Sequence, residues 1–75
     1  MAELNSVMEA IAESGVMDDM SKFDPDKTFK ENGIDSLDVM SLFLAVEEKF
    51  GIKFSEEEVG QINTAAELVK ALNAR

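Results

Sequence analysis

Apolar residues recur at helical spacing in several separate segments of the chain. In the first segment the apolar positions are three or four residues apart and glutamates occupy the other faces: Leu4, Val7, Met8 and Ile11 against Glu3, Glu9 and Glu13. This spacing predicts an amphipathic helix over about residues 2–14, which Gly15 ends.

A second helix is predicted over about residues 36–50, with Gly51 at its end. Its apolar residues form two adjacent stripes: Val39, Phe43, Val46 and Phe50, beside Leu37, Met40 and Leu44. A helix with so wide an apolar sector is either surrounded by other helices or keeps part of its surface for a partner.

Two capping signals predict further helices. Ser55 precedes Glu58 by three residues, and Thr64 precedes Glu67 by the same spacing. A Ser or Thr followed three positions later by Glu is typical of a helix start, where the two residues exchange hydrogen bonds. We therefore expect a short helix over about residues 56–61 and a last helix that begins after Thr64.

The segment over residues 15–35 has turn signals instead of a helical pattern. Asp24-Pro25-Asp26 lies in its middle and Asn32-Gly33 near its end. Twenty-one residues are long for a connection in a small domain, so we expect a functional role or an extra short turn. Six apolar residues are expected to fasten this segment to the core: Val16, Met17, Met20, Phe23, Phe29 and Ile34.

These elements predict an all-α fold. It is a small bundle of four helices, three longer and one short, with a long loop between the first and second. No strand pattern and no internal repeat interrupts the series. We expect a single domain over residues 1–75, which acts as a monomer.

Charge narrows the set of partners. Sixteen Asp and Glu against seven Lys and Arg give a net charge of −9. Such a chain repels nucleic acid and anionic membranes and favours proteins with basic docking surfaces. No apolar run has the length of a membrane span and no targeting segment is recognisable, so a cytoplasmic location is expected.

Missing residue types narrow the chemistry. The chain has no Cys and no His, and so no thiolate nucleophile and no near-neutral general base. An enzyme is not expected. Residues 24–35 have the length of a calcium loop, but Phe29 stands where that loop requires glycine, so no metal site is expected.

Ser36 is the candidate for chemistry, because it lies between two carboxylates at the start of the second helix. Its ordinary interpretation is that of an N-cap. The alternative gives the cap to Asp35, which accepts hydrogen bonds near Asp38 and leaves the Ser36 hydroxyl free. A helix N-terminus favours an attached phosphate through its N–H groups and its dipole.

The stretch Gly33-Ile34-Asp35-Ser36-Leu37-Asp38, followed by residues 42–50 with Glu47-Glu48, resembles the signature of the acyl carrier proteins. The resemblance implies that Ser36 carries 4′-phosphopantetheine, which a phosphopantetheinyl transferase adds from coenzyme A. It also implies a carrier that holds acyl intermediates as thioesters for enzymes of fatty acid, polyketide or specialised lipid synthesis. The chain departs from the family pattern at Asn32, where relatives often have leucine, and at Ser41, where they often have an acidic residue.

The same resemblance assigns two groups of residues. The residues expected to dock acyl-loading and acyl-processing enzymes are Asp35, Leu37, Asp38, Met40, Glu47 and Glu48. The residues expected to form the interior and an acyl pocket are Val39, Phe43, Leu44, Val46, Phe50, Phe54, Ile62 and Leu68. Phe43 and Phe54 are expected to reduce the space, which favours short or polar cargo.

Two other interpretations stay open. A carrier of aminoacyl or peptidyl groups would use the same arm with different partners. An unmodified helical interaction module would use Ser36 only to begin a helix. A test for attachment of the arm would distinguish this module from both kinds of carrier. The two kinds of carrier can be distinguished only by identifying the cargo.

Overall fold

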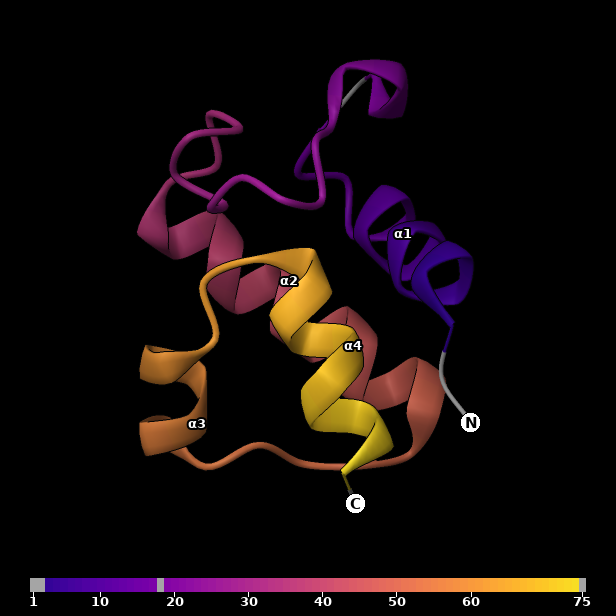
Figure 1. Ribbon diagram of the computed structural model, residues 1–75, viewed down its shortest axis with the longest axis vertical. Helices are drawn as coiled ribbons and strands as arrows, with labels where there is room; N and C mark the ends of the chain where they lie inside the picture. The colour runs from indigo at the N-terminus through magenta and orange to yellow at the C-terminus, as the bar shows by residue number, and fades with distance from the viewer. Residues whose placement is uncertain (1–2, 18, 75) are drawn as a thin grey trace.

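Four α-helices and one short 3-10 turn make up the described part of the chain, residues 3–17 and 19–74 of a computed structural model. Their order is α1 (Leu4–Glu13), η1 (Met20–Lys22), α2 (Ser36–Phe50), α3 (Glu56–Gln61) and α4 (Ala65–Asn73) (Figure 1). No strand occurs among these residues, so the predicted all-α bundle is confirmed. The expected start of the first helix, residue 2, lies outside the described residues.

Both predicted capping boxes are present. The Ser55 hydroxyl accepts from the Glu58 N–H at 3.1 Å, and the Glu58 carboxylate accepts from the Ser55 N–H at 3.0 Å. Thr64 and Glu67 make the same reciprocal pair at 3.0 and 3.2 Å. Each pair satisfies N–H groups that have no acceptor within the helix, which fixes where α3 and α4 begin.

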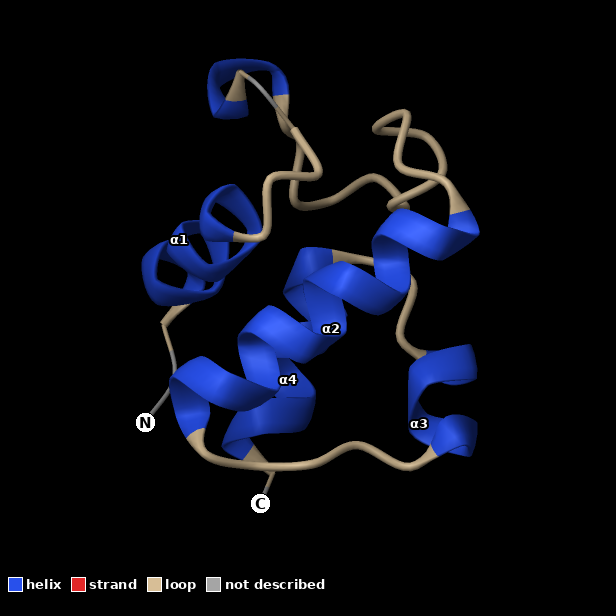
Figure 2. Cartoon of the chain, turned by 180° about the vertical axis from the view of Figure 1, so that it is seen from behind, coloured by secondary structure: helices blue, strands red, loops and turns tan. Residues whose placement is uncertain are grey.

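The core lies where α1 packs against α2 and α4, whereas α3 packs less closely against the other helices. In Figure 2, α2 crosses the molecule diagonally, with α1 on one side and α3 on the other. The core residues are Val7, Ala10, Ile11, Phe23, Phe29, Ile34, Leu42, Phe43, Val46, Ile62, Ala65 and Leu68. Since α3 is loosely packed, the side of α2 that faces it is the less densely filled side.

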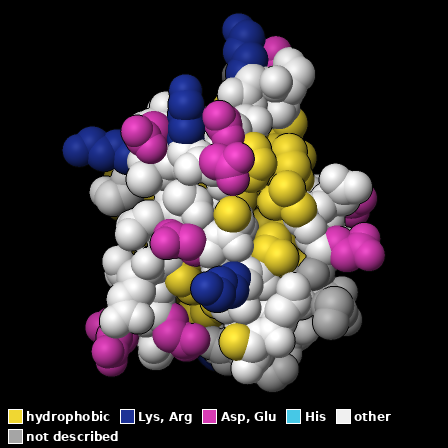
Figure 3. All heavy atoms as spheres, in the orientation of Figure 1, with side chains coloured by type: hydrophobic (Ala, Val, Ile, Leu, Met, Phe, Trp, Pro, Cys, Tyr) yellow, Lys and Arg dark blue, Asp and Glu magenta, His cyan; other side chains and the backbone are white. Residues whose placement is uncertain are grey.

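The long loop is fastened to the core as predicted. Phe23, Phe29 and Ile34 are buried, while Val16, Met17 and Met20 are half-buried against the core. The extra turn is η1. In Figure 3, hydrophobic side chains surface where the loop meets α1, and acidic side chains are spread over the rest of this face.

Backbone hydrogen bonds join the loop to the start of α4. An isolated antiparallel bridge pairs Thr28 with Thr64, and the Phe29 N–H donates to the Asn63 carbonyl at 2.9 Å. The Ala66 N–H donates to the Pro25 carbonyl at 3.2 Å. The segment that precedes α2 is therefore held by an element that lies some 35 residues further along the chain.

One predicted interior residue is exposed to solvent. Leu44 is 59% exposed, because the buried face of α2 is formed by Leu42, Phe43 and Val46. The other apolar stripe of α2 faces solvent, with Leu37 75% and Met40 61% exposed. The wide apolar sector thus comprises a buried face and a free surface, and the expectation that Leu44 belongs to the interior was wrong.

No described helix has both the length and the apolar character that crossing a bilayer requires.

Candidate functional site

Ser36 is the first residue of α2, and Asp35 is its N-cap. The Asp35 carboxylate accepts from the Asp38 N–H at 2.9 Å, and the Asp35 carbonyl accepts from the Val39 N–H at 2.9 Å. The Ser36 side chain is exposed and makes no hydrogen bond with another described residue. Because Asp35 does the capping, the Ser36 hydroxyl is free.

The backbone before Ser36 turns at Gly33 and is anchored at Ile34. Gly33 has φ of +84°, a left-handed conformation that costs glycine little. The Ile34 side chain is 2% exposed, and its N–H donates to the Phe29 carbonyl at 2.9 Å. With Ile34 directed into the core, Asp35 and Ser36 lie at the surface.

Asn32 links two parts of the loop that precedes the site. Its side-chain oxygen accepts from the Asp24 N–H at 2.8 Å. Its amide nitrogen donates to the carbonyls of Asp24 at 2.9 Å and Thr28 at 3.0 Å. The sequence indicates a turn at Asn32-Gly33 and a departure from the family pattern at Asn32, but not these hydrogen bonds to a residue eight positions earlier.

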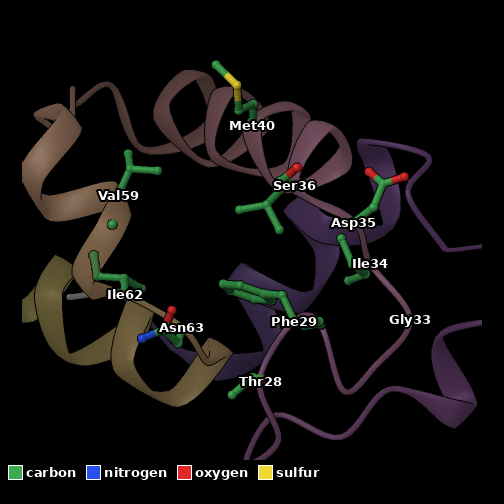
Figure 4. A pocket seen from close by; sticks show the side chains of 13 residues that line it. Thr28, Phe29, Gly33, Ile34, Asp35, Ser36, Met40, Val59, Ile62 and Asn63 are labelled. Carbon is green, nitrogen blue, oxygen red and sulfur yellow. The ribbon is translucent and has the colours of Figure 1, made fainter.

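A hollow of about 750 Å³ opens beside Ser36, between the start of α2, the loop over residues 28–35 and α3. We call it the first hollow. Figure 4 shows Ser36 on its α2 side, with Phe29 and Ile34 from the loop and Val59 and Ile62 further along the chain. Its lining is mostly apolar, so it suits a hydrocarbon chain better than a charged group.

A second hollow of about 370 Å³ lies further along α2. It is lined by Met40, Phe43, Leu44, Glu47, Phe54, Glu56 and Val59. The Phe43 ring packs edge to face on Phe54 at 5.3 Å and on Phe29, of the first hollow, at 6.2 Å between ring centroids. Three aromatic rings in contact therefore run from one hollow to the other.

The eight residues expected in the interior and acyl pocket fall into three groups. Val39 and Ile62 line the first hollow, whereas Phe43, Leu44 and Phe54 line the second. Val46, Phe50 and Leu68 line neither. Val46 and Leu68 are fully buried in the core and Phe50 is half-buried, so these three are packing residues.

The six expected docking residues differ in exposure. Asp35, Leu37, Met40 and Glu48 are exposed, while Asp38 and Glu47 are half-buried. Glu47 has a structural contact that the sequence did not indicate: one carboxylate oxygen accepts from the Phe54 N–H at 2.7 Å. This bond ties the end of α2 to the segment before α3.

Lys49 crosses from α2 to α1. Its ammonium lies 3.2 Å from the Glu13 carboxylate and 3.5 Å from that of Glu9. The hydrogen bond to Glu13 raises the pKa of Lys49 above its usual value, with smaller contributions from the charge of Glu13 and from Glu9. These two ion pairs join α1 and α2 at a place outside the hollows.

The arrangement presents a free hydroxyl at the positive end of a helix dipole, next to an apolar hollow. The dipole and the first N–H groups favour a phosphoester on Ser36, and the Asp35 and Asp38 carboxylates offset part of that effect. No His or Cys in the chain could act as base or nucleophile. The site can therefore hold an attached group and shelter its apolar end.

Comparisons with known proteins identify a family and two similar proteins. The family described as "Phosphopantetheine attachment site" matches residues 5–72. The chain is similar to the "Acyl carrier protein, mitochondrial" of Dictyostelium discoideum, with 48% identity over 48 residues that cover 64% of this chain and 40% of that protein. The chain thus spans less than half the length of this curated relative.

A solved structure is also similar over nearly the whole chain. It is the butyryl-ACP, described as a non-polar, non pathway intermediate, from the actinorhodin polyketide synthase of Streptomyces coelicolor. The TM-score is 0.79 at 25% sequence identity, and the match covers 99% of this chain and 90% of the other.

Proposed function

We propose that this chain, which belongs to the family of phosphopantetheine attachment sites, is an acyl carrier protein and not an enzyme, and that it carries covalent 4′-phosphopantetheine on Ser36. The single observation that supports this assignment is that the helix cap and the free hydroxyl at the start of α2 belong to different residues. Asp35 caps the helix, so the Ser36 hydroxyl is exposed and unpaired among the described residues.

The residues around Ser36 fit such an arm. The phosphodiester would lie at the N-terminus of α2, and the apolar first hollow would receive the cargo. The arm supplies a thiol, which the chain lacks, and holds acyl groups on it as thioesters. The chain's own contribution is to fix the attachment point and to shield the cargo from water.

The partner surface of the proposed carrier is the exposed side of α2. Leu37, Met40 and Leu44 form an apolar row there, and Asp35 and Glu48 add exposed carboxylates. Partners would combine a basic surface with an apolar contact. They would include a phosphopantetheinyl transferase and enzymes that load and process acyl groups.

The pathway proposed for the carrier is fatty acid, polyketide or specialised lipid synthesis. The solved structure from a polyketide synthase supports the polyketide part of this range, and the relative named mitochondrial bears on the compartment. We place the carrier in the cytoplasm, with the mitochondrion as the alternative. Cell fractionation with detection of the intact protein distinguishes the two compartments.

Intact mass tests the attachment. Incubation with coenzyme A and a promiscuous phosphopantetheinyl transferase should add the mass of one arm, and Ser36→Ala should abolish the gain. Ser41→Ala is the matched control, since Ser41 is also an exposed serine on α2. An unmodified wild-type chain would instead support a helical interaction module, whereas equal modification of Ser36→Ala would mean that the arm is attached to another residue.

A further inference from the structure

The methionines of this chain are its only readily oxidised side chains. The sequence holds five of them and no Cys, Trp, Tyr or His. Among the four that the structure describes, Met40 is 61% exposed, whereas Met8, Met17 and Met20 are half-buried against the core. Because oxidation follows exposure, the Met40 sulfur is the one that an oxidant dissolved in water reaches first.

Met40 lies on α2 in the apolar row that the proposed function assigns to partners. Its neighbours on that face are Leu37, three residues before it, and Leu44, four residues after it, which are 75% and 59% exposed. Ser36 is four residues before Met40, and both line the first hollow. In Figure 4 the Met40 side chain turns outward from α2. A polar group formed on this sulfur would therefore lie within the docking surface, one helical turn from the attachment point.

We propose that Met40 is a site of reversible oxidation and that its sulfoxide weakens the docking of partner enzymes. The docking part of this inference rests on the proposed function. The oxidant is a peroxide, with hydrogen peroxide as the simplest case. A lone pair of the Met40 sulfur attacks one peroxide oxygen, so that the S–O bond forms as the O–O bond breaks. The proton of the transferred hydroxyl passes to the leaving hydroxide, which departs as water; sulfur loses the two electrons that reduce the peroxide.

The sulfoxide changes the docking surface without changing its charge. Its S–O bond is strongly polar and accepts hydrogen bonds from water, and an apolar contact with a partner would remove that water. Asp35 and Glu48 keep their exposed carboxylates, so the attraction to a basic partner and its dependence on salt are retained. We expect weaker binding of the docked complex and an unchanged chemical step at Ser36.

Peptide mapping tests the modification site. Trypsin releases residues 31–49, in which Met40 is the only methionine, and residues 1–22, which hold the other four. At limiting hydrogen peroxide, Met40 should gain an oxygen at nearly the same rate in the folded protein as in urea. Fragmentation of the other peptide should show Met8, Met17 and Met20 oxidised several times more slowly in the folded protein than in urea. Equal protection of Met40 would overturn the proposal.

The kinetics of arm transfer test the effect on docking. The chain is treated with hydrogen peroxide, catalase removes the excess, and coenzyme A and the transferase are then added. Complete oxidation of Met40 should raise the KM for the carrier about tenfold and leave kcat nearly unchanged, because the lost contact acts in binding. Methionine sulfoxide reductases with a dithiol should restore the original KM. The melting temperatures of the two forms should differ by less than about 4 °C, since Met40 is exposed.

Two leucine variants locate the effect, and each is compared with its own untreated form. In Met40→Leu, peroxide treatment should not change the KM. Met8→Leu is the matched control, because Met8 is also a helical methionine but lies on α1, outside the docking row. Peroxide should raise the KM of Met8→Leu as it does in the wild type. An equal rise in Met40→Leu would show that another methionine is responsible and would overturn the proposal.

Failure of the carrier assignment would look different. An untreated chain that gains no arm removes the carrier function and the docking part of this inference together, and the peptide map then decides whether Met40 is the reactive sulfur. If the arm is gained with the same KM before and after complete oxidation of Met40, the carrier function stands and this inference falls.

Discussion

Asn32 stabilises the site at the scale of a single side chain. Replacing it by alanine removes three hydrogen bonds of 2.8 to 3.0 Å and leaves half-buried backbone groups of Asp24 without their partner. We expect Asn32→Ala to lower the free energy of unfolding by about 1–3 kcal/mol, because partners of a lost buried hydrogen bond are left desolvated. Urea titration of the unloaded protein measures the change.

Asn63 provides the control for Asn32. It is an exposed asparagine whose side-chain amide has one long contact, 3.4 Å to the Gln61 carbonyl. Asn63→Ala should therefore change stability by no more than about 0.5 kcal/mol. Equal effects of the two substitutions would show that the Asn32 side chain does not hold the loop.

At the scale of elements, α3 is the weakest helix and the easiest to strengthen. Gly60 lies inside it without positive φ, and a Cβ built there meets no other atom within 4 Å. Gly60→Ala should stabilise the protein by roughly 0.5–1 kcal/mol, because alanine loses less backbone freedom on folding. Thermal unfolding of the unloaded chain measures the gain.

Gly51→Ala is the contrasting substitution for Gly60→Ala. Gly51 ends α2 with φ of +65°, where a Cβ is strained even though space is available. The loss should be about 1–2 kcal/mol. The prediction for α3 is contradicted if Gly60→Ala lowers the melting temperature, as Gly51→Ala should.

Helix boundaries were predictable from the sequence because their causes are local. Asp35, Ser55 and Thr64 each cap a helix through an N–H only three residues away. Gly51 ends α2 by its own conformation. A free Ser36 hydroxyl could be expected from equally local information, because the neighbouring residue Asp35 can cap the helix in its place.

Features that depend on distant partners could not be predicted. The sequence shows that α2 is apolar over a wide sector, but only the positions of α1 and α4 decide that Leu42 is buried and Leu44 exposed. The bond from the Phe54 N–H to Glu47 and the pairing of Thr28 with Thr64 likewise need the folded chain. The two hollows, which are spaces between elements, have no local signal.

At the scale of the whole molecule, Lys49 is a cation held between helices of a strongly acidic chain. Its pKa in the folded protein is raised above 10.5 by its bond to Glu13. A raised folded pKa means that the stabilising contribution is complete below the unfolded value and is lost as pH rises through the folded one. We therefore expect this contribution to persist at neutral pH and to disappear only in the alkaline range above 10.5.

The measurement for Lys49 is a comparison of melting temperatures between about pH 9 and pH 12, for the wild type and Lys49→Gln. The wild type should lose more stability than the variant over this interval. The chain has no tyrosine, so no phenol titrates in the same range. Parallel curves for the two proteins would mean that Lys49 has the same pKa folded and unfolded.

The reciprocal caps on α3 and α4 have a kinetic consequence. Each closes a loop of three residues, so it can form before distant parts of the chain meet. Helical bundles whose contacts are mostly local refold within microseconds to milliseconds, whereas an enzyme typically needs roughly 1 to 1,000 ms per turnover. A helix that loosens during one delivery would thus have re-formed before the next enzyme completes its cycle.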